Sequence, residues 1–178
     1  TKHEYCSAHE DRCTYYFVGE PLTSQRLQYQ TEISSARSTT AVELSITRNS
    51  LPVYVPSTIV LMHGFRASKE FMVNTALYFR FLGFNVIVPD LLGHGESAGK
   101  KTFGVIDSYV INEIIAKEHV PQRNLYLLGN SMGAVAATRI ASMRDDIHGL
   151  ILQAPMLNFG EAVYRYSNSN YPFLAGLI

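Results

Sequence analysis

The sequence of 178 residues has little charge, few cysteines and no long hydrophobic run. Charged side chains make up 17% of it, below the usual ~25%, and fifteen basic side chains balance fifteen acidic ones. This balance, with no run of like charge, argues against nucleic acid or an anionic membrane surface as a partner. No stretch approaches the ~20 apolar residues of a membrane-spanning helix. Hydrophobic residues still account for 47% of the chain, so we expect one globular domain with a sizeable core.

The chain has two cysteines, Cys6 and Cys13, both in a polar N-terminal segment. They could form a local disulfide, which would suit a periplasmic or secreted protein, or remain two surface thiols in a cytoplasmic one. The sequence favours the first alternative only slightly. No Cys-x-x-Cys or clustered His pattern is present, so we expect no metal and no cofactor. The chain starts at Thr1 without an initiator Met or a signal-peptide pattern, which indicates a processed start or a start within a longer sequence.

The most informative motif is Gly-Asn-Ser-Met-Gly at residues 129–133. It follows a short apolar run and precedes small, helix-forming residues, which predicts the strand, sharp turn and helix of a nucleophile elbow. Gly129 and Gly133 lack a Cβ, so the strand and the helix can approach closely around a strained residue. Ser131 would expose its hydroxyl at a helix N-terminus, where unpaired N–H groups favour a developing negative charge. The motif therefore predicts nucleophilic attack on a carbonyl group.

Strand and helix patterns alternate around this motif. Further continuous apolar runs predict buried parallel strands at residues 58–65, 85–90 and 147–153. Apolar residues at helical spacing predict helices over residues 68–82 and 103–119. This alternation specifies right-handed βαβ units, so we predict an α/β fold with a doubly wound, mostly parallel sheet.

The chain divides into three predicted parts. Residues 1–25 are polar and Tyr-rich without clear periodicity, and we expect an N-terminal arm. Residues 26–156 form the core, which opens with two half-buried antiparallel strands over residues 26–48 at the outer edge of the sheet. Residues 157–178 predict the start of an incomplete cap or insertion. Its aromatic side chains, which either line an acyl pocket or pack the core of the cap, are Phe159, Tyr164, Tyr166, Tyr171 and Phe173.

Three motifs stand in order, with a strand and a helix between each. They are His63-Gly64 at a strand end, the loop Pro-Asp-Leu-Leu-Gly-His-Gly-Glu-Ser at residues 89–97, and the Ser131 elbow. From about residue 27 to residue 160 this set resembles the α/β-hydrolase superfamily, and within it the serine aminopeptidase-like and monoglyceride-lipase-like branch. The resemblance implies an esterase, lipase, thioesterase or peptidase that needs no cofactor and acts on a small acyl substrate.

The same resemblance assigns roles to individual residues. Ser131 matches the nucleophile, and Phe65 and Met132 match the positions whose backbone N–H groups form the oxyanion hole. His63, with Gly64 after it, orders its loop, and His94 belongs to a structural loop that shapes one wall of the pocket.

The remaining members of a catalytic triad are missing. The family order is Ser, then Asp or Glu, then His, yet residues 156–178 contain Glu161 and no His or Asp. We expect Asp107, Asp145 and Asp146 to be solvated or capping residues. We therefore predict an N-terminal fragment of a serine hydrolase, truncated after about the sixth strand and inactive alone, that cleaves an ester, thioester or amide through an acyl-serine. The alternative is a complete, non-catalytic module that binds a ligand in the remnant pocket.

Overall fold

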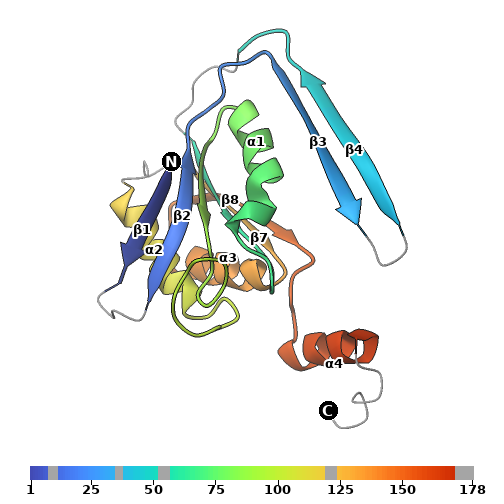
Figure 1. The fold of residues 1–178 in the computed structure, drawn as a ribbon. Coiled ribbons are helices and arrows are strands. Elements are labelled where there is room, and N and C mark those ends of the chain that lie inside the picture. The colour runs from blue at the N-terminus through green and yellow to red at the C-terminus, as the bar shows by residue number, and fades with distance from the viewer. Residues whose placement is uncertain (8–11, 35–37, 52–56, 119–123, 171–178) are drawn as a thin grey trace.

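A computed structural model describes residues 1–7, 12–34, 38–51, 57–118 and 124–170. Its centre is a six-stranded sheet with the strand order β1-β2-β6-β5-β7-β8 (Figure 1). Four of these strands pair in parallel: β5 (Thr58–Met62), β6 (Asn85–Pro89), β7 (Leu125–Asn130) and β8 (Ile147–Gln153). The continuous apolar runs of the sequence thus form the parallel strands predicted from them.

Helices cover both faces of this sheet, so the doubly wound arrangement is present. Alternate residues of β5 face opposite layers, and all five are buried. Val60 and Met62 pack with α2 (Asp107–Lys117) and α3 (Met132–Met143). Ile59 and Leu61 pack on the other face, towards the 3-10 turn η1 (Lys69–Met72) and α1 (Val73–Phe81). Burial of one such side chain contributes about 1.5–3 kcal/mol to the stability of the fold. Because β5 buries side chains on both faces of the sheet, it is a central strand of the core.

The expected N-terminal arm is wrong for residues 1–25. This segment contains β1 (Lys2–Cys6) and β2 (Cys13–Gly19), and β2 pairs antiparallel with β6. Tyr16 is fully buried on β2, and its hydroxyl donates a hydrogen bond of 2.5 Å to Glu118. Burial and this bond raise the pKa of Tyr16. The segment is therefore part of the sheet and of its core.

Residues 26–48 form the two antiparallel strands that their alternation predicts, but not at the predicted place. Strands β3 (Arg26–Ser34) and β4 (Thr39–Thr47) make a separate two-stranded sheet that projects beside α1 (Figure 1). Leu27 is buried and pairs with Ile46, whereas most of β4 is exposed. β2 occupies the position beside β6 and β1 forms the edge next to it, which leaves the hairpin outside the main sheet.

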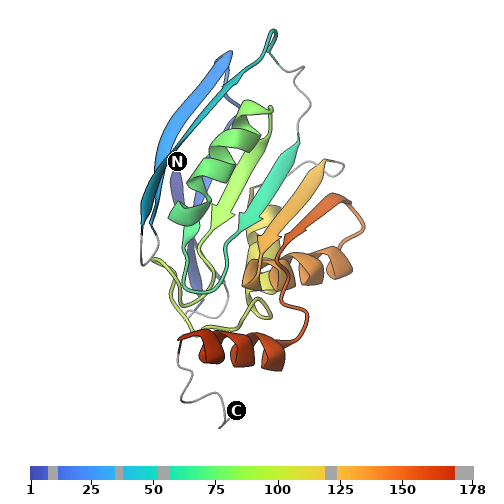
Figure 2. The ribbon, with the colours of Figure 1, turned by 90° about the vertical axis from the view of Figure 1, so that its right-hand side faces the viewer.

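After β8 the chain turns into α4 (Phe159–Asn170), which lies across one end of the sheet (Figure 2). Asn158 begins this helix, since its side-chain oxygen accepts a hydrogen bond from the Glu161 N–H, as an N-cap residue does. None of the helices in the described parts of the chain is long and apolar enough to cross a bilayer.

Candidate active site

Ser131 occupies the turn between β7 and α3. Its backbone has φ 51° and ψ −108°, a conformation that costs a non-glycine residue about 1–3 kcal/mol. Two glycines let the strand and the helix meet around it: a Cβ on Gly129 would lie 2.3 Å from the Gly133 carbonyl oxygen. The Ser131 N–H donates a hydrogen bond of 2.8 Å to the Gln153 carbonyl, which ties this turn to β8. The predicted strand, turn and helix are thus present, with Ser131 at the strained position.

The backbone after β5 passes directly beside this turn. A Cβ on Gly133 would lie 2.3 Å from the Met62 carbonyl oxygen and 2.7 Å from that of His63. A Cβ on Gly64 would lie 3.4 Å from the Ser131 Cβ. These close approaches hold the His63-Gly64 backbone against the first turn of α3.

A cavity of about 340 Å³ opens in front of Ser131. It is lined mainly by apolar side chains, and α4 forms one side of it. The lining residues are Phe65, Phe103, Ser131, Met132, Met156, Ala162 and Val163. This lining includes both residues that the resemblance relates to an oxyanion hole, and, among the described residues, no acid and no base. A volume of this size is at the lower end of the range for small-molecule sites.

Among the described side chains, Phe65 and Phe103 are the aromatic ones in this wall, and their rings stack with centroids 5.5 Å apart. Of the aromatic residues considered from the sequence, the side chains of Phe159 and Tyr166 are outside the described ones. Tyr164 is 47% exposed and lies outside the lining, while Tyr171 and Phe173 lie outside the described residues.

His63 and His94 extend this aromatic pair into the interior. The Phe65 ring meets the His94 ring edge-on at 5.7 Å, and His94 meets His63 at 5.5 Å. His63 is fully buried; its Nε2 accepts the Leu91 N–H at 3.0 Å while its Nδ1 bonds to the Gly64 carbonyl. Burial lowers the pKa of His63. With both ring nitrogens engaged, His63 orders the loop and is not placed to take a proton from Ser131.

His94 is also buried, and its Nδ1 donates to the Leu92 carbonyl. Its Nε2 has no hydrogen-bond partner among the described residues, and its side chain is absent from the cavity lining. The described link between His94 and the cavity is its ring contact with Phe65. A further histidine, His148, is exposed on the edge strand β8 and lines a separate depression with Asn112.

No local sequence pattern indicates the buried cation that lies beside these loops. Lys69 is fully buried, and its ammonium lies 2.7 Å from Asp90, 2.6 Å from Glu96 and 2.9 Å from Glu70. Burial opposes the charged form of Lys69, but these hydrogen bonds prevail and raise its pKa. Asp90 also accepts the backbone N–H groups of Lys69 and Glu96. The cluster fastens η1 to the loop that follows β6.

Of the two alternatives expected for Asp107, solvated or capping, the first is wrong because the residue is buried at the start of α2. One carboxylate oxygen accepts the Leu92 N–H at 2.7 Å. The other accepts the Thr102 hydroxyl at 2.5 Å and the Gly104 N–H at 2.9 Å. Asp146, by contrast, pairs with Arg144 in a partly buried position, and Asp145 is exposed.

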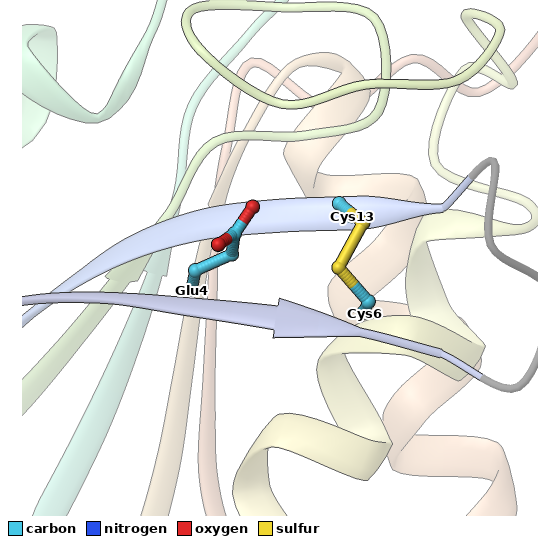
Figure 3. A group of neighbouring side chains, drawn as sticks. All are labelled: Glu4, Cys6 and Cys13. Carbon is cyan, nitrogen blue, oxygen red and sulfur yellow. A yellow bond between two sulfur atoms is a disulfide. The ribbon is translucent and has the colours of Figure 1, made fainter.

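The two cysteines are joined as a disulfide between facing positions of β1 and β2 (Figure 3). Together with Glu4 they form a group of three possible metal ligands, the one such group in the described part of the chain. Because the sulfurs are bonded to each other, this group offers no thiolate to a metal ion.

Comparison with known proteins identifies relatives of this arrangement. The family model "Serine aminopeptidase, S33" matches residues 55–176, well over half of the chain. The uncharacterized protein YqkD of Bacillus subtilis is 31% identical over 134 residues, which cover 69% of this chain and 44% of YqkD. Human protein ABHD8 is 30% identical over 98 residues, which cover 53% of this chain and 22% of ABHD8. The chain thus spans less than half the length of these relatives.

Solved structures show the same fold. A probable hydrolytic enzyme from Pseudomonas aeruginosa superposes with a TM-score of 0.64 at 18% identity, over 96% of this chain and 49% of that enzyme. An esterase from Exiguobacterium antarcticum superposes with a TM-score of 0.58 at 16% identity, over 92% of this chain and 55% of the esterase. The family match and the shared fold lead to one conclusion: the chain belongs to the serine aminopeptidase S33 family of the α/β-hydrolase superfamily.

Proposed function

We propose that this chain carries the nucleophile and oxyanion hole of a serine hydrolase. The observation that carries the proposal is Ser131 itself: a non-glycine residue with positive φ at the N-terminus of α3, on the wall of an apolar cavity. A strained backbone persists only where its surroundings enforce it, and such positions concentrate at functional sites. A half-buried serine hydroxyl on the cavity wall at this turn suits attack on a carbonyl carbon.

In the proposed reaction the Ser131 oxygen bonds to the carbonyl carbon of an ester, thioester or amide. The carbonyl electron pair moves onto its oxygen, and the backbone N–H groups of Phe65 and Met132 stabilise that charge. One such donor is worth about 3 kcal/mol in comparable enzymes. The leaving group departs with the serine proton, and water then releases the acid from the acyl-serine.

A serine hydroxyl is a weak nucleophile without a base. The described residues that line the cavity include no such base. We therefore assign the base and its acidic partner to a region that corresponds to the part of the relatives not covered by this chain. The apolar lining supports a small or medium acyl group as substrate, with α4 as part of a cap over it.

The test is to label the protein from its natural source with a fluorophosphonate, followed by intact mass and mapping of the modified peptide. An adduct on Ser131 in a protein well above 19.9 kDa, lost in Ser131→Ala, supports the proposal. A folded 19.9 kDa protein that takes no label overturns it and favours the non-catalytic binding module.

A further inference from the structure

The buried carboxylate of Asp107 contacts two parts of the connection between β6 and α2, next to the cavity. Its bond to the Leu92 N–H holds the loop after β6, and its bonds to Thr102 and Gly104 hold the turn before α2. A buried charge is costly unless hydrogen bonds compensate it, and here three donors do so. Asp107 therefore joins the first and the last part of the connection between β6 and α2.

Both contacts lead to the ring row formed by Phe103, Phe65, His94 and His63. On one side, Asp107 holds Gly104, the residue next to Phe103. On the other side, it holds Leu92, whose carbonyl accepts the Nδ1–H of His94. Asp107 thus fixes the outer end of the row at Phe103 and the inner part at His94, with Phe65 between them.

Phe103 is held in a conformation that it would not adopt unaided. Its φ is 53°, unusual for an aromatic residue, and Gly104 follows with φ 89°. A Cβ on Gly104 would lie 2.7 Å from the Met132 carbonyl oxygen, so this turn rests on the first turn of α3. The strained turn brings the Phe103 ring into the cavity wall beside Ser131.

Capping of α2 does not account for the Asp107 carboxylate. The N-cap residue of α2 is Ile106, which makes no side-chain cap hydrogen bond, and the Thr102 hydroxyl accepts the backbone N–H groups of Ile106 and Asp107 at 3.2 and 3.4 Å. The carboxylate contacts are all with the two parts of the connection between β6 and α2, the Thr102 hydroxyl included.

We propose that Asp107 is a positioning residue that fixes Phe103 as the wall limiting the length of the acyl group bound beside Ser131. This inference rests on the proposed hydrolase function, because the cavity is taken as the acyl site. Phe103 is the specificity-determining residue, and Asp107 acts through it. Loss of either one opens the cavity to longer chains.

The test uses the protein at its natural length and p-nitrophenyl esters from butanoate to dodecanoate. In Asp107→Asn one of the two acceptor oxygens becomes an NH₂ donor, so the side chain loses either its bond to the Leu92 N–H or its bonds to Thr102 and Gly104, and one of its two attachments to the ring row is released. We expect the ratio of kcat/KM for dodecanoate to that for butanoate to rise about tenfold, both in Asp107→Asn and in Phe103→Ala. Asp145→Asn, an exposed aspartate in the same chain, is the matched control and leaves the ratio unchanged.

The double variant Asp107→Asn/Phe103→Ala distinguishes an effect of Asp107 through the position of Phe103 from a general loosening of the cavity wall. If Asp107 acts through Phe103, adding Asp107→Asn to Phe103→Ala changes the ratio little further. Additive effects, or a folded Asp107→Asn with the wild-type ratio, overturn the inference. Should Asp107→Asn fail to fold, Thr102→Val removes one of the three donors and is tested in the same cycle.

A readout without turnover distinguishes failure of this inference from failure of the proposed function. In protein labelled with 4-fluorophenylalanine, the ¹⁹F signals of Phe103 and Phe65 shift in Asp107→Asn, and alcohols of four to twelve carbons perturb the Phe65 signal on binding. We expect the longest alcohol that binds to be longer in Asp107→Asn than in wild type. If no ester is hydrolysed but these shifts occur, the hydrolase proposal fails and the positioning role stands; unchanged signals overturn the positioning role.

Discussion

Gly133 and Met62 meet backbone to backbone, since a Cβ on Gly133 would lie 2.3 Å from the Met62 carbonyl oxygen. This contact joins the first turn of α3 to the end of β5. The two segments carry Met132 and Phe65, whose N–H groups we assign to one oxyanion hole. The distance between the two donors thus depends on a contact with no room for a side chain.

Gly133→Ala should therefore destabilise the protein and abolish labelling of Ser131. The added methyl group must push two backbones apart, at a cost of about 2–3 kcal/mol in free energy of unfolding. Urea denaturation measures this cost, and Gly160→Ala in α4 is the control because its Cβ would have no atom closer than 3.4 Å. Equal stability of the two variants would contradict the role given to this contact.

Substitution of Lys69 should lower the free energy of unfolding strongly, and its effect should not add to that of substituting Asp90. Lys69→Met leaves the buried Asp90 carboxylate without its cation, and we expect a loss of about 3–5 kcal/mol. Lys69→Met combined with Asp90→Asn should cost less than the sum of the two single changes. Lys2→Met is the control, since Lys2 binds the same Glu96 from an exposed position and contributes at most about 1 kcal/mol. If the loss in the double variant equalled the sum of the two single losses, Lys69 and Asp90 would not be coupled, contrary to this prediction.

Stability should fall as the pH drops below the ordinary histidine pKa. Burial lowers the pKa of His63 in the folded protein, so the unfolded chain takes up a proton that the folded chain resists. The contribution of His63 to the free energy of unfolding is fully present above pH ~6.5. It is lost progressively as the pH falls towards the pKa of His63 in the folded protein. Protonated Nε2 could no longer accept the Leu91 N–H.

Chemical denaturation between pH 5 and pH 7.5 checks this dependence. His63→Gln keeps a side chain that can accept a hydrogen bond but does not titrate, so its stability should vary less over this range. The same slope in both proteins would assign the pH dependence to other groups. Glu70 contributes mainly below this range: the Ser68 hydroxyl and Lys69 outweigh the effect of burial and lower its pKa to about 2, so its stabilising effect is lost as the pH falls below the ordinary value of 4.5.

Features set by local pattern were predictable from the sequence. Strands β5 to β8 and helix α3 follow from apolar runs and helical spacing, and the turn at Ser131 follows from its two glycines. These signals lie within a few residues of the structure they specify. Family and fold followed from them, because three such motifs in order are rarely shared by chance.

Features set by distant partners were not predictable. In β2, Thr14 and Tyr16 face the core, but strand status depends on pairing with β6, about seventy residues away. The alternation in β3 and β4 gives an apolar face without saying which surface it meets. The residues next to Lys69 or Asp107 in the sequence do not show that these side chains are buried, because their burial depends on partners further along the chain. The sequence therefore located the strained turn at Ser131 and missed the buried charges in the loops around it.

The Cys6–Cys13 disulfide should stabilise the sheet edge that supports the loop after β6. The Cys13 carbonyl accepts the Ala98 N–H at 2.9 Å, and the Tyr15 N–H donates to the Ser97 hydroxyl at 3.0 Å. Closing so short a loop contributes about 2 kcal/mol, mainly by restricting the unfolded chain. Dithiothreitol should lower the urea midpoint of the wild type to that of Cys6→Ala/Cys13→Ala, and should leave that double variant unchanged. If the reductant had no effect on the wild type, β1 and β2 would be held by their backbone pairing and by Tyr16 alone, and the disulfide would contribute nothing to the stability of the loop beside the site.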